Sequence, residues 1–112
     1  MKDKDLIRLQ HMLEASRDAK SFAEGRQQND LYKDKMLTMA IIKELEIIGE
    51  AAVNVSQETR DRFPQIPWTD IIGMRNRLVH VYFRVNLYVI WSTVQRNLTE
   101  LIEELEKIPG LK

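Results

Sequence analysis

The apolar residues near the carboxyl end of the chain follow a helical repeat. Between residues 87 and 108 they recur at alternating steps of four and three, which places them along one side of an α-helix and does not fit the two-residue repeat of a strand. Asn86 is a suitable N-cap before the repeat, and Pro109 with Gly110 is a stop after it. The pattern predicts a long helix that packs within its own bundle rather than against a partner chain. Its positions are Leu87, Trp91, Val94, Leu98, Leu101, Leu105 and Ile108.

Further segments carry similar helical repeats. Gly25 follows the first of them, at a position suited to a helix C-cap. Pro67 is suited to the first position of the third main helix. The predicted helices cover residues 6–23, 34–55 and 68–79, with a shorter charged one at 56–63.

Four main helices joined by short or moderate connections indicate an all-α fold. With few strand signals and no internal repeat, the sequence predicts an up-and-down helical bundle with additional short helical turns. Its 112 residues, of which 44% are hydrophobic, suit a single domain over residues 1–112.

The composition excludes several kinds of site and location. No apolar run approaches the roughly 18 residues of a membrane-spanning helix, and the first residues lack the apolar stretch of a signal peptide. We therefore expect a cytoplasmic protein without membrane association. The absence of cysteine agrees with that compartment and excludes disulfides and thiolate metal sites. Since the formal net charge is zero, binding of nucleic acid would depend on a local site.

Arg75 and His80 form the strongest candidate for a chemical site. Four residues separate them, in the stretch RNRLVHVY at positions 75–82. An arginine neutralises phosphate charge with a fixed fork of donors, and a histidine both takes and gives a proton near neutral pH. Cleavage of a phosphodiester through a ribose 2′-hydroxyl needs these groups: a base, an acid and positive charge for the transition state.

Arg75 stands where a core residue is expected. On a helical wheel it falls about 40° from Ile71, inside the apolar stripe of the third main helix. An unpaired buried guanidinium is costly, so Arg75 must find a carboxylate, a cleft or a phosphate. The acidic partners available on the preceding long helix are Glu44, Glu46 and Glu50. The residues alone leave the phosphate site and the structural ion pair equally open.

His80 is harder to place beside Arg75, because five steps along one helix set it about 140° around the axis. The two side chains meet if the helix ends before His80, if the long arginine closes the gap, or if a second chain completes the site. Taken alone, a histidine near a helix end is more often a cap or surface residue than a catalyst. The other histidine, His11, lies on the first predicted helix without a matching motif.

Four stretches, taken in order, resemble the HepT group of HEPN proteins (higher eukaryotes and prokaryotes nucleotide-binding). The similarity covers nearly the whole chain, including the order and length of the helices. The stretches are LEIIGEAA at 45–52, IPW at 66–68, DIIGMRNRLVH at 70–80 and YF at 82–83.

The resemblance implies a HEPN-like, homodimeric bundle that is the toxin of a toxin–antitoxin pair. It implies a ribonuclease that cuts tRNA or mRNA without a metal or other cofactor. The family's R-x4-H-x-Y motif maps onto Arg75, His80 and Tyr82, with Asn76 and Arg77 in supporting positions. In that family the antitoxin is a nucleotidyltransferase that adds AMP to the motif tyrosine, here Tyr82, and thereby silences the ribonuclease.

Two positions depart from the family pattern. Val81 replaces a glycine that is common between the histidine and the tyrosine, and Asn86 stands where aspartate is frequent. A β-branched residue at position 81 can stiffen or crowd the chain and so reduce the efficiency of cleavage or modification.

Other functional interpretations of these residues have less support in the sequence. Glu46 and Glu50 share a helix face, but no metal-ligand spacing joins them, so a solvated face or pairing with an arginine is favoured over a metal site. Within a ribonuclease, the second proton-transfer group would come from His80 of a second copy. The alternatives are a non-catalytic HEPN binding module that docks a nucleotidyltransferase and accepts its AMP, and a structural dimer with Arg75 ion-paired.

Overall fold

The computed structural model describes residues 1–80 and 86–112, and leaves the side chains of residues 79 and 80 undescribed. These residues contain no strand, which confirms the predicted all-α class. No helix among them is long and apolar enough to cross a membrane. The elements are α1 (Asp3–Ala23), α2 (Asp30–Lys33), α3 (Lys35–Asn54), α4 (Gln57–Arg62), α5 (Trp68–His80), α6 (Leu87–Ser92), the π-helical segment η2 (Thr93–Asn97) and α7 (Leu98–Glu106).

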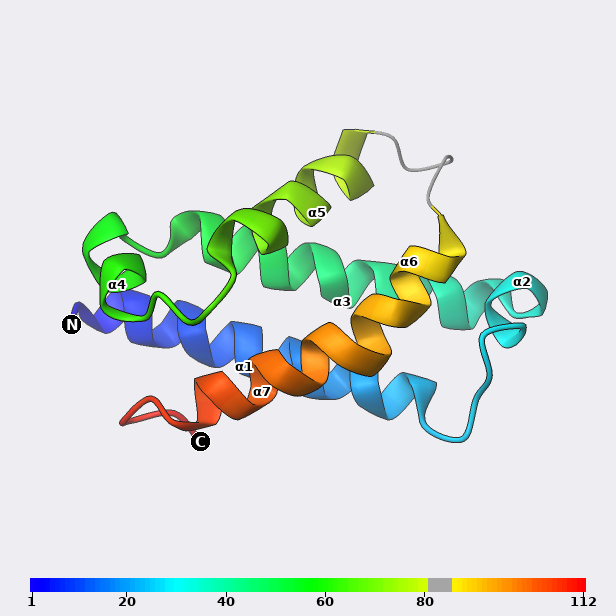
Figure 1. The fold of residues 1–112 in the computed structure, drawn as a ribbon, viewed down its shortest axis with the longest axis horizontal. Helices are drawn as coiled ribbons and strands as arrows, with labels where there is room; N and C mark the ends of the chain where they lie inside the picture. Colours follow the sequence, from blue (N-terminus) through cyan, green and yellow to red (C-terminus); the bar gives the residue numbers. More distant parts are fainter. Residues whose placement is uncertain (81–85) are drawn as a thin grey trace.

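The bundle is built on the two longest helices, α1 and α3, which pack against each other along their length (Figure 1). α6, η2 and α7 follow one another as a single rod, and this rod packs on α1 through η2 and α7. α5 packs on α3 instead. The four main helices and the short turns α2 and α4 therefore form the predicted up-and-down bundle.

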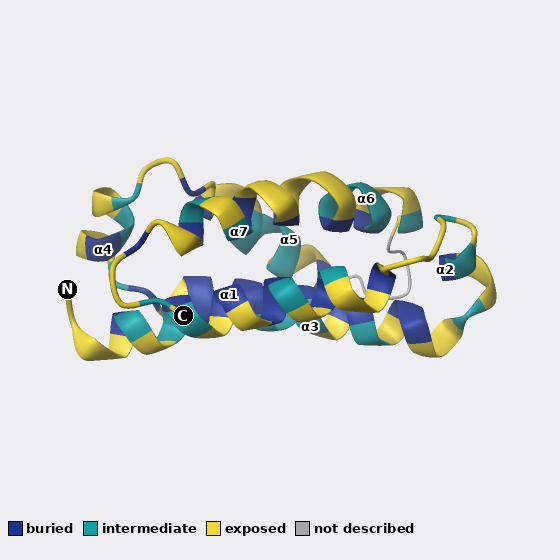
Figure 2. Ribbon diagram, turned by 90° about the horizontal axis from the view of Figure 1, so that it is seen from below, coloured by how far each residue is buried: buried dark blue, intermediate teal, exposed yellow. Residues whose placement is uncertain are grey.

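The core lies where the inner faces of α1, α3 and the last rod meet. In Figure 2, buried residues run along the facing sides of these helices and exposed residues cover the outer sides. Burial of apolar side chains at three- and four-residue steps is the main favourable term that holds such a bundle together. The side chains with almost no solvent exposure include Leu9, Met12, Leu13, Ile41, Ile90 and Leu105.

The last predicted helix differs from expectation at its centre, where η2 forms a π turn between α6 and α7. A π turn contains one residue more than an α turn, so the buried face before it shifts by about one position. Ile90, which the repeat left out, is 1% exposed, whereas Leu87 and Trp91 are only partly buried. Beyond Val94 the predicted repeat is buried as expected. Asn86 caps α6 as predicted, by accepting hydrogen bonds from the next helical turn.

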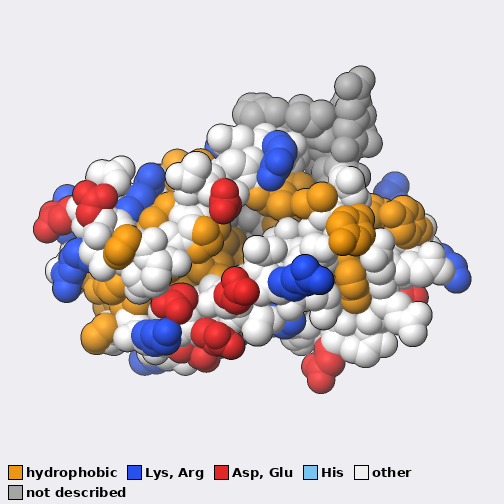
Figure 3. Space-filling model, viewed as in Figure 1, with side chains coloured by type: hydrophobic (Ala, Val, Ile, Leu, Met, Phe, Trp, Pro, Cys, Tyr) orange, Lys and Arg blue, Asp and Glu red, His pale blue; other side chains and the backbone are white. Residues whose placement is uncertain are grey.

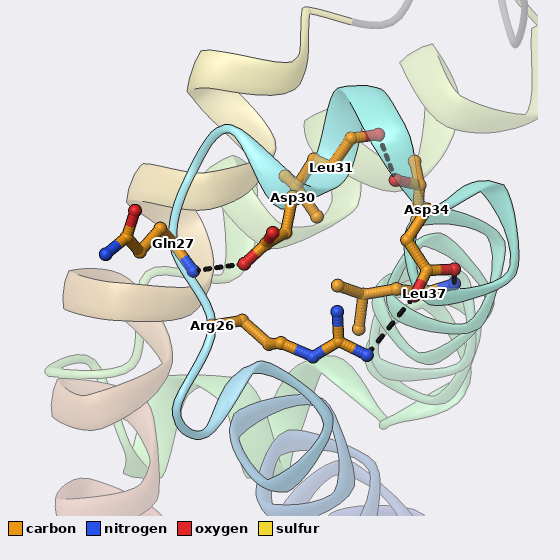
Figure 4. A network of polar contacts seen from close by, with 7 residues as sticks. Arg26, Gln27, Asp30, Leu31, Asp34 and Leu37 are labelled. Carbon is orange, nitrogen blue, oxygen red and sulfur yellow. Dashed lines mark hydrogen bonds and ion pairs between the residues drawn. The ribbon is translucent and has the colours of Figure 1, made fainter.

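The connection between α1 and α3 is fixed by local hydrogen bonds (Figure 4). Gly25 ends α1 in the left-handed region, with φ of +73°, as its position predicted. Asp34 caps α3 by accepting a hydrogen bond of 3.0 Å from the backbone N–H of Leu37, and it pairs with Arg26 at 3.2 Å. The backbone N–H of Gln27 donates to Asp30, and the Thr38 hydroxyl donates to the carbonyl of Leu31.

The start of α4 is tied to the start of α1 by a buried carboxylate. Asp5 is 2% exposed and accepts hydrogen bonds from the Ser56 backbone N–H at 3.0 Å and from the Thr59 hydroxyl at 2.7 Å. The Ser56 hydroxyl donates to the same carboxylate. Because Ser56 is also the N-cap of α4, this network positions the chain that leads toward α5.

α5 begins at Trp68, as the predicted range has it, but Pro67 does not take the first helical position. The carbonyl of Pro67 accepts the first helical hydrogen bond, from the Ile71 N–H at 3.0 Å, so Pro67 is the cap and not the first helical residue. Trp68 is 9% exposed and its indole N–H donates to the carbonyl of Phe63 at 3.0 Å. The backbone of α5 continues as helix through His80, so the helix does not end before the histidine.

Candidate functional site

Arg75 of α5 lies at a close contact with Gly49 of α3. A Cβ added to Gly49 of α3 would overlap the Cβ of Arg75 and lie 2.7 Å from its Cγ. Two helices approach this closely only where one of them has no side chain. Gly49 therefore determines where the first atoms of the Arg75 side chain lie between the two helices. The guanidinium then extends along the surface of α3.

The guanidinium is held by Glu50 and by Asn76. Its Nε donates to one oxygen of Glu50 at 2.9 Å, its Nη2 forms an ion pair with the same oxygen at 2.7 Å, and its Nη1 donates to the side-chain oxygen of Asn76 at 2.8 Å. The side chain of Arg75 is 24% exposed and that of Glu50 is 58% exposed. Arg75 is therefore oriented by hydrogen bonds and still reaches solvent.

The acidic residues of α3 are not equivalent. Of the three considered from the sequence, Glu50 is the one within ion-pair distance of Arg75 in the described part of the chain. Burial, together with the charge of Asp18, raises the pKa of Glu44 above its ordinary value. Glu46 is half-buried and belongs to no ion pair between described residues.

Arg77 lies on a different side of α5, on the wall of a groove of about 670 Å³. The groove separates α5 from η2 and α7, with Leu45 and Ile48 of α3 as its floor. Asp70 of α5 and Asn97 of η2 are polar residues on its walls. Figure 3 looks onto this side of the molecule, where hydrophobic side chains show in the hollow between α5 and the last rod, with charged side chains near its edges.

The predicted motif is only partly within the described residues. Arg75, Asn76 and Arg77 are described, and Asn76 and Arg77 are exposed. For His80 the backbone at the end of α5 is described, but its side chain lies outside the description, as do all of Val81 and Tyr82. The structure thus brings together Arg75, Asn76 and Glu50 and leaves the two other motif side chains as predictions.

Among the side chains that the structure describes, which do not include that of His80, no three from His, Asp or Glu gather closely enough to hold a metal ion.

Gly49 and the groove are two features that sequence reasoning missed. The pair Gly49-Glu50 carried a usable signal, because a glycine inside a strongly apolar helix often marks a close approach between backbones. No sequence signal indicated the groove, because the groove depends on the distance between α5 and the last rod.

Comparison with known proteins agrees with this architecture. The sequence pattern described as "Ribonuclease HepT-like" matches residues 12–108. "Putative RNase TTE0752" of Caldanaerobacter subterraneus subsp. tengcongensis is 38% identical over 100 residues, which are 89% of each chain. "Putative RNase MJ1380" of Methanocaldococcus jannaschii is 34% identical over 98 residues, 88% of this chain and 90% of that one.

A third relative carries the family name itself. "Probable ribonuclease HepT" of Thermococcus cleftensis is 39% identical over 79 residues, which are 70% of this chain and 72% of its own. No solved structure matches the chain significantly. Because the family pattern spans most of the sequence and three relatives align over most of their lengths, the chain belongs to the ribonuclease HepT-like family.

Proposed function

We propose that this chain is a metal-independent endoribonuclease, the toxin of a cytoplasmic toxin–antitoxin pair, working as one domain. The observation that carries the proposal is Arg75, a partly exposed guanidinium fixed on the surface by Glu50 and Asn76. Membership of a family described as ribonuclease supports the same activity.

The chemistry follows from the residues. A base removes the proton from a ribose 2′-hydroxyl, whose oxygen attacks the adjacent phosphorus. The 5′-oxygen leaves with a proton from an acid, and the products are a 2′,3′-cyclic phosphate and a 5′-hydroxyl. Arg75 would bind the phosphate oxygens as negative charge develops, and His80 would transfer the protons.

A homodimer would supply the second proton-transfer group, since His11 stands far from the motif in sequence. We propose that the two His80 residues converge on one cleft, one as base and the other as acid. Mixed dimers that contain one His80→Ala chain would then be nearly inactive. Activity near half of wild type would show that each chain carries its own site.

A nucleotidyltransferase antitoxin would silence the enzyme at Tyr82. Transfer of AMP from ATP to the tyrosine hydroxyl releases pyrophosphate and leaves a phosphodiester on the side chain. Such an anion close to Arg75 in sequence would compete with RNA for the guanidinium.

The decisive experiment incubates the purified protein with total tRNA and mRNA in EDTA, for wild type, Arg75→Ala and His80→Ala. Cleavage by wild type alone would establish a metal-independent ribonuclease that uses this motif. Mass spectrometry must first show that Tyr82 carries no AMP, because modified protein would be silent.

The ion pair itself favours one other function. Because Glu50 already neutralises Arg75, the chain could be a non-catalytic HEPN binding module that docks a nucleotidyltransferase and accepts its AMP. If none of the three unmodified proteins cuts RNA and the wild type binds the nucleotidyltransferase stably, the result would favour this module.

A further inference from the structure

We infer that Glu50 is a positioning residue for Arg75: it holds one edge of the guanidinium so that the opposite edge faces the RNA phosphate. The inference rests on the proposed ribonuclease function for its kinetic consequence, but the contact itself can be tested without any RNA.

Two consecutive residues of α3 act on the two ends of the arginine side chain. Gly49 lies against its Cβ and Cγ and fixes where the side chain begins. Glu50 binds its Nε and Nη2 and fixes where the side chain ends. An arginine held at both ends loses little conformational freedom when it binds a phosphate, which is the condition for efficient charge stabilisation in a transition state.

The hydrogen bonds leave the right donors free. A guanidinium has five N–H donors in a planar fork. Glu50 takes the edge formed by Nε and Nη2, and Asn76 takes one donor of Nη1. Nη1 and Nη2 keep N–H donors beyond these contacts, and a pair of parallel guanidinium N–H groups is the fork that binds two oxygens of one phosphate. Glu50 and a phosphate can therefore bind Arg75 at the same time.

A purely structural role explains the contact less well. The carboxylate of Glu50 is 58% exposed, and ion pairs that are open to solvent contribute little to stability. α3 and α5 pack against each other apart from this ion pair, and both contribute apolar residues to the core.

A blocking role makes the opposite kinetic prediction. If Glu50 only competed with RNA for Arg75, its removal would raise the activity. If it positions Arg75, its removal lowers the activity, and a neutral side chain that still accepts hydrogen bonds restores much of it.

The test compares Glu50→Ala, Glu50→Gln and the control Glu46→Gln, which lies one turn away on α3 and is not paired with Arg75. We expect Glu50→Ala to lower kcat by about 10- to 100-fold, the scale of a misplaced catalytic group, with a smaller change in KM. Glu50→Gln should stay within a few-fold of wild type, because its amide oxygen still accepts from Arg75. The control should match wild type, and thermal unfolding should show all variants folded at the assay temperature.

Nitrogen-15 NMR of the arginine Nε–H groups gives a readout that is independent of RNA. The Arg75 signal, assigned with Arg75→Lys, should be protected from solvent exchange in wild type and in Glu50→Gln, and should be lost in Glu50→Ala. An unchanged signal in Glu50→Ala would overturn the inference whether or not the protein cuts RNA. Equal or higher activity of Glu50→Ala would overturn it too, whereas a wild type that cuts no RNA would refute the proposed function and leave the NMR result to decide the contact.

Discussion

Gly49 of α3 and Arg75 of α5 are in direct contact, and the backbone at residue 49 occupies the place that any larger side chain would need. The other glycine inside a long helix, Gly73 of α5, is in the opposite situation, since a Cβ added there would meet nothing within 4 Å. The two glycines therefore provide a matched pair for testing how the candidate site is built.

Gly49→Ala should both destabilise the protein and weaken the site. The added methyl group would force α3 and α5 apart, and overpacking of this kind costs about 1–3 kcal/mol. That cost outweighs the gain from replacing glycine in a helix, which is about 1 kcal/mol. Urea unfolding would measure the loss, and RNA cleavage should fall because Arg75 is displaced from Glu50.

Gly73→Ala is the control for helix propensity alone. We expect it to stabilise the protein by about 0.5–1 kcal/mol, because the new methyl group points into open space and alanine restricts the unfolded chain. Equal effects of the two substitutions would contradict the close approach of α3 and α5 at Gly49.

The network around Asp5 predicts a dependence of stability on pH. Burial alone would raise the pKa of Asp5, but the hydrogen bonds from Ser56 and Thr59 outweigh it, with help from the charge of Lys2, and hold this pKa below its ordinary value. A carboxylate whose pKa is lowered by folding stabilises the protein above the pKa of the unfolded chain, about 3.9. This contribution is lost as the pH falls from there through the lowered value.

Asp5→Asn should therefore lower the free energy of unfolding by about 1–3 kcal/mol at pH 7, because the amide cannot accept all of the donors that the carboxylate accepts. Urea unfolding at a series of pH values should show the difference from wild type shrinking as the pH drops below about 4. Asp3→Asn, an exposed position in the same turn of α1, is the control. A difference that stays constant down to pH 2.5 would rule out this role of the Asp5 charge.

The capping hydrogen bonds of Asn86 are expected to stabilise the last rod. Its side-chain oxygen accepts from the backbone N–H groups of Tyr88 and Val89, at 2.9 and 3.3 Å. Asn86→Ala should cost about 1 kcal/mol in urea unfolding, whereas Asn86→Asp should cost almost nothing, because aspartate caps helices as well as asparagine does. A loss in Asn86→Asp as large as that in Asn86→Ala would show that the amide nitrogen has an unrecognised role.

The helices could be predicted because their signals are local. Apolar periodicity, the cap Asn86 and the stop at Gly25 are all readable within a few residues, and the structure confirms the helices, the cap and the stop. Asp34 and Ser56 were expected as the first residues of their helices and are the N-caps instead. The π turn of η2 could not be predicted, because the heptad repeat runs through it without a break. Within the π turn, the carbonyl of Gln95 accepts from Lys20 of α1 at 3.4 Å, a contact that depends on how the rod packs.

The ion-pair partner of Arg75 could not be predicted from the sequence for a similar reason. The sequence offered three glutamates on α3, and the choice between them depends on where α5 crosses α3. Gly49 sets that crossing, so the glutamate next to it, Glu50, receives the guanidinium. The position of Arg75 in the apolar stripe of α5 predicted that its side chain would face α3. The position of Arg77 on the groove wall could not be predicted, because η2 and α7 form the other side of that groove.

The position of Arg77 on the groove wall predicts that RNA binds along the groove. It is exposed on the groove wall and has no ion pair within residues 1–80 and 86–112, so its charge is available to a phosphate. If RNA runs along the groove, Arg77→Glu should weaken binding and reduce the slope of log affinity against log salt by about 0.7 for each lost phosphate contact. Binding should be measured by fluorescence anisotropy in a His80→Ala background, so that the RNA stays intact.

The matched control is Arg62→Glu, an exposed arginine on α4 that lies outside the groove. It changes the net charge by the same amount, so a general electrostatic effect would weaken binding equally in both variants. A selective loss in Arg77→Glu would assign the groove to the RNA, because only that variant alters charge inside it. Equal losses would instead place the RNA elsewhere and restrict the role of α5 in binding to Arg75.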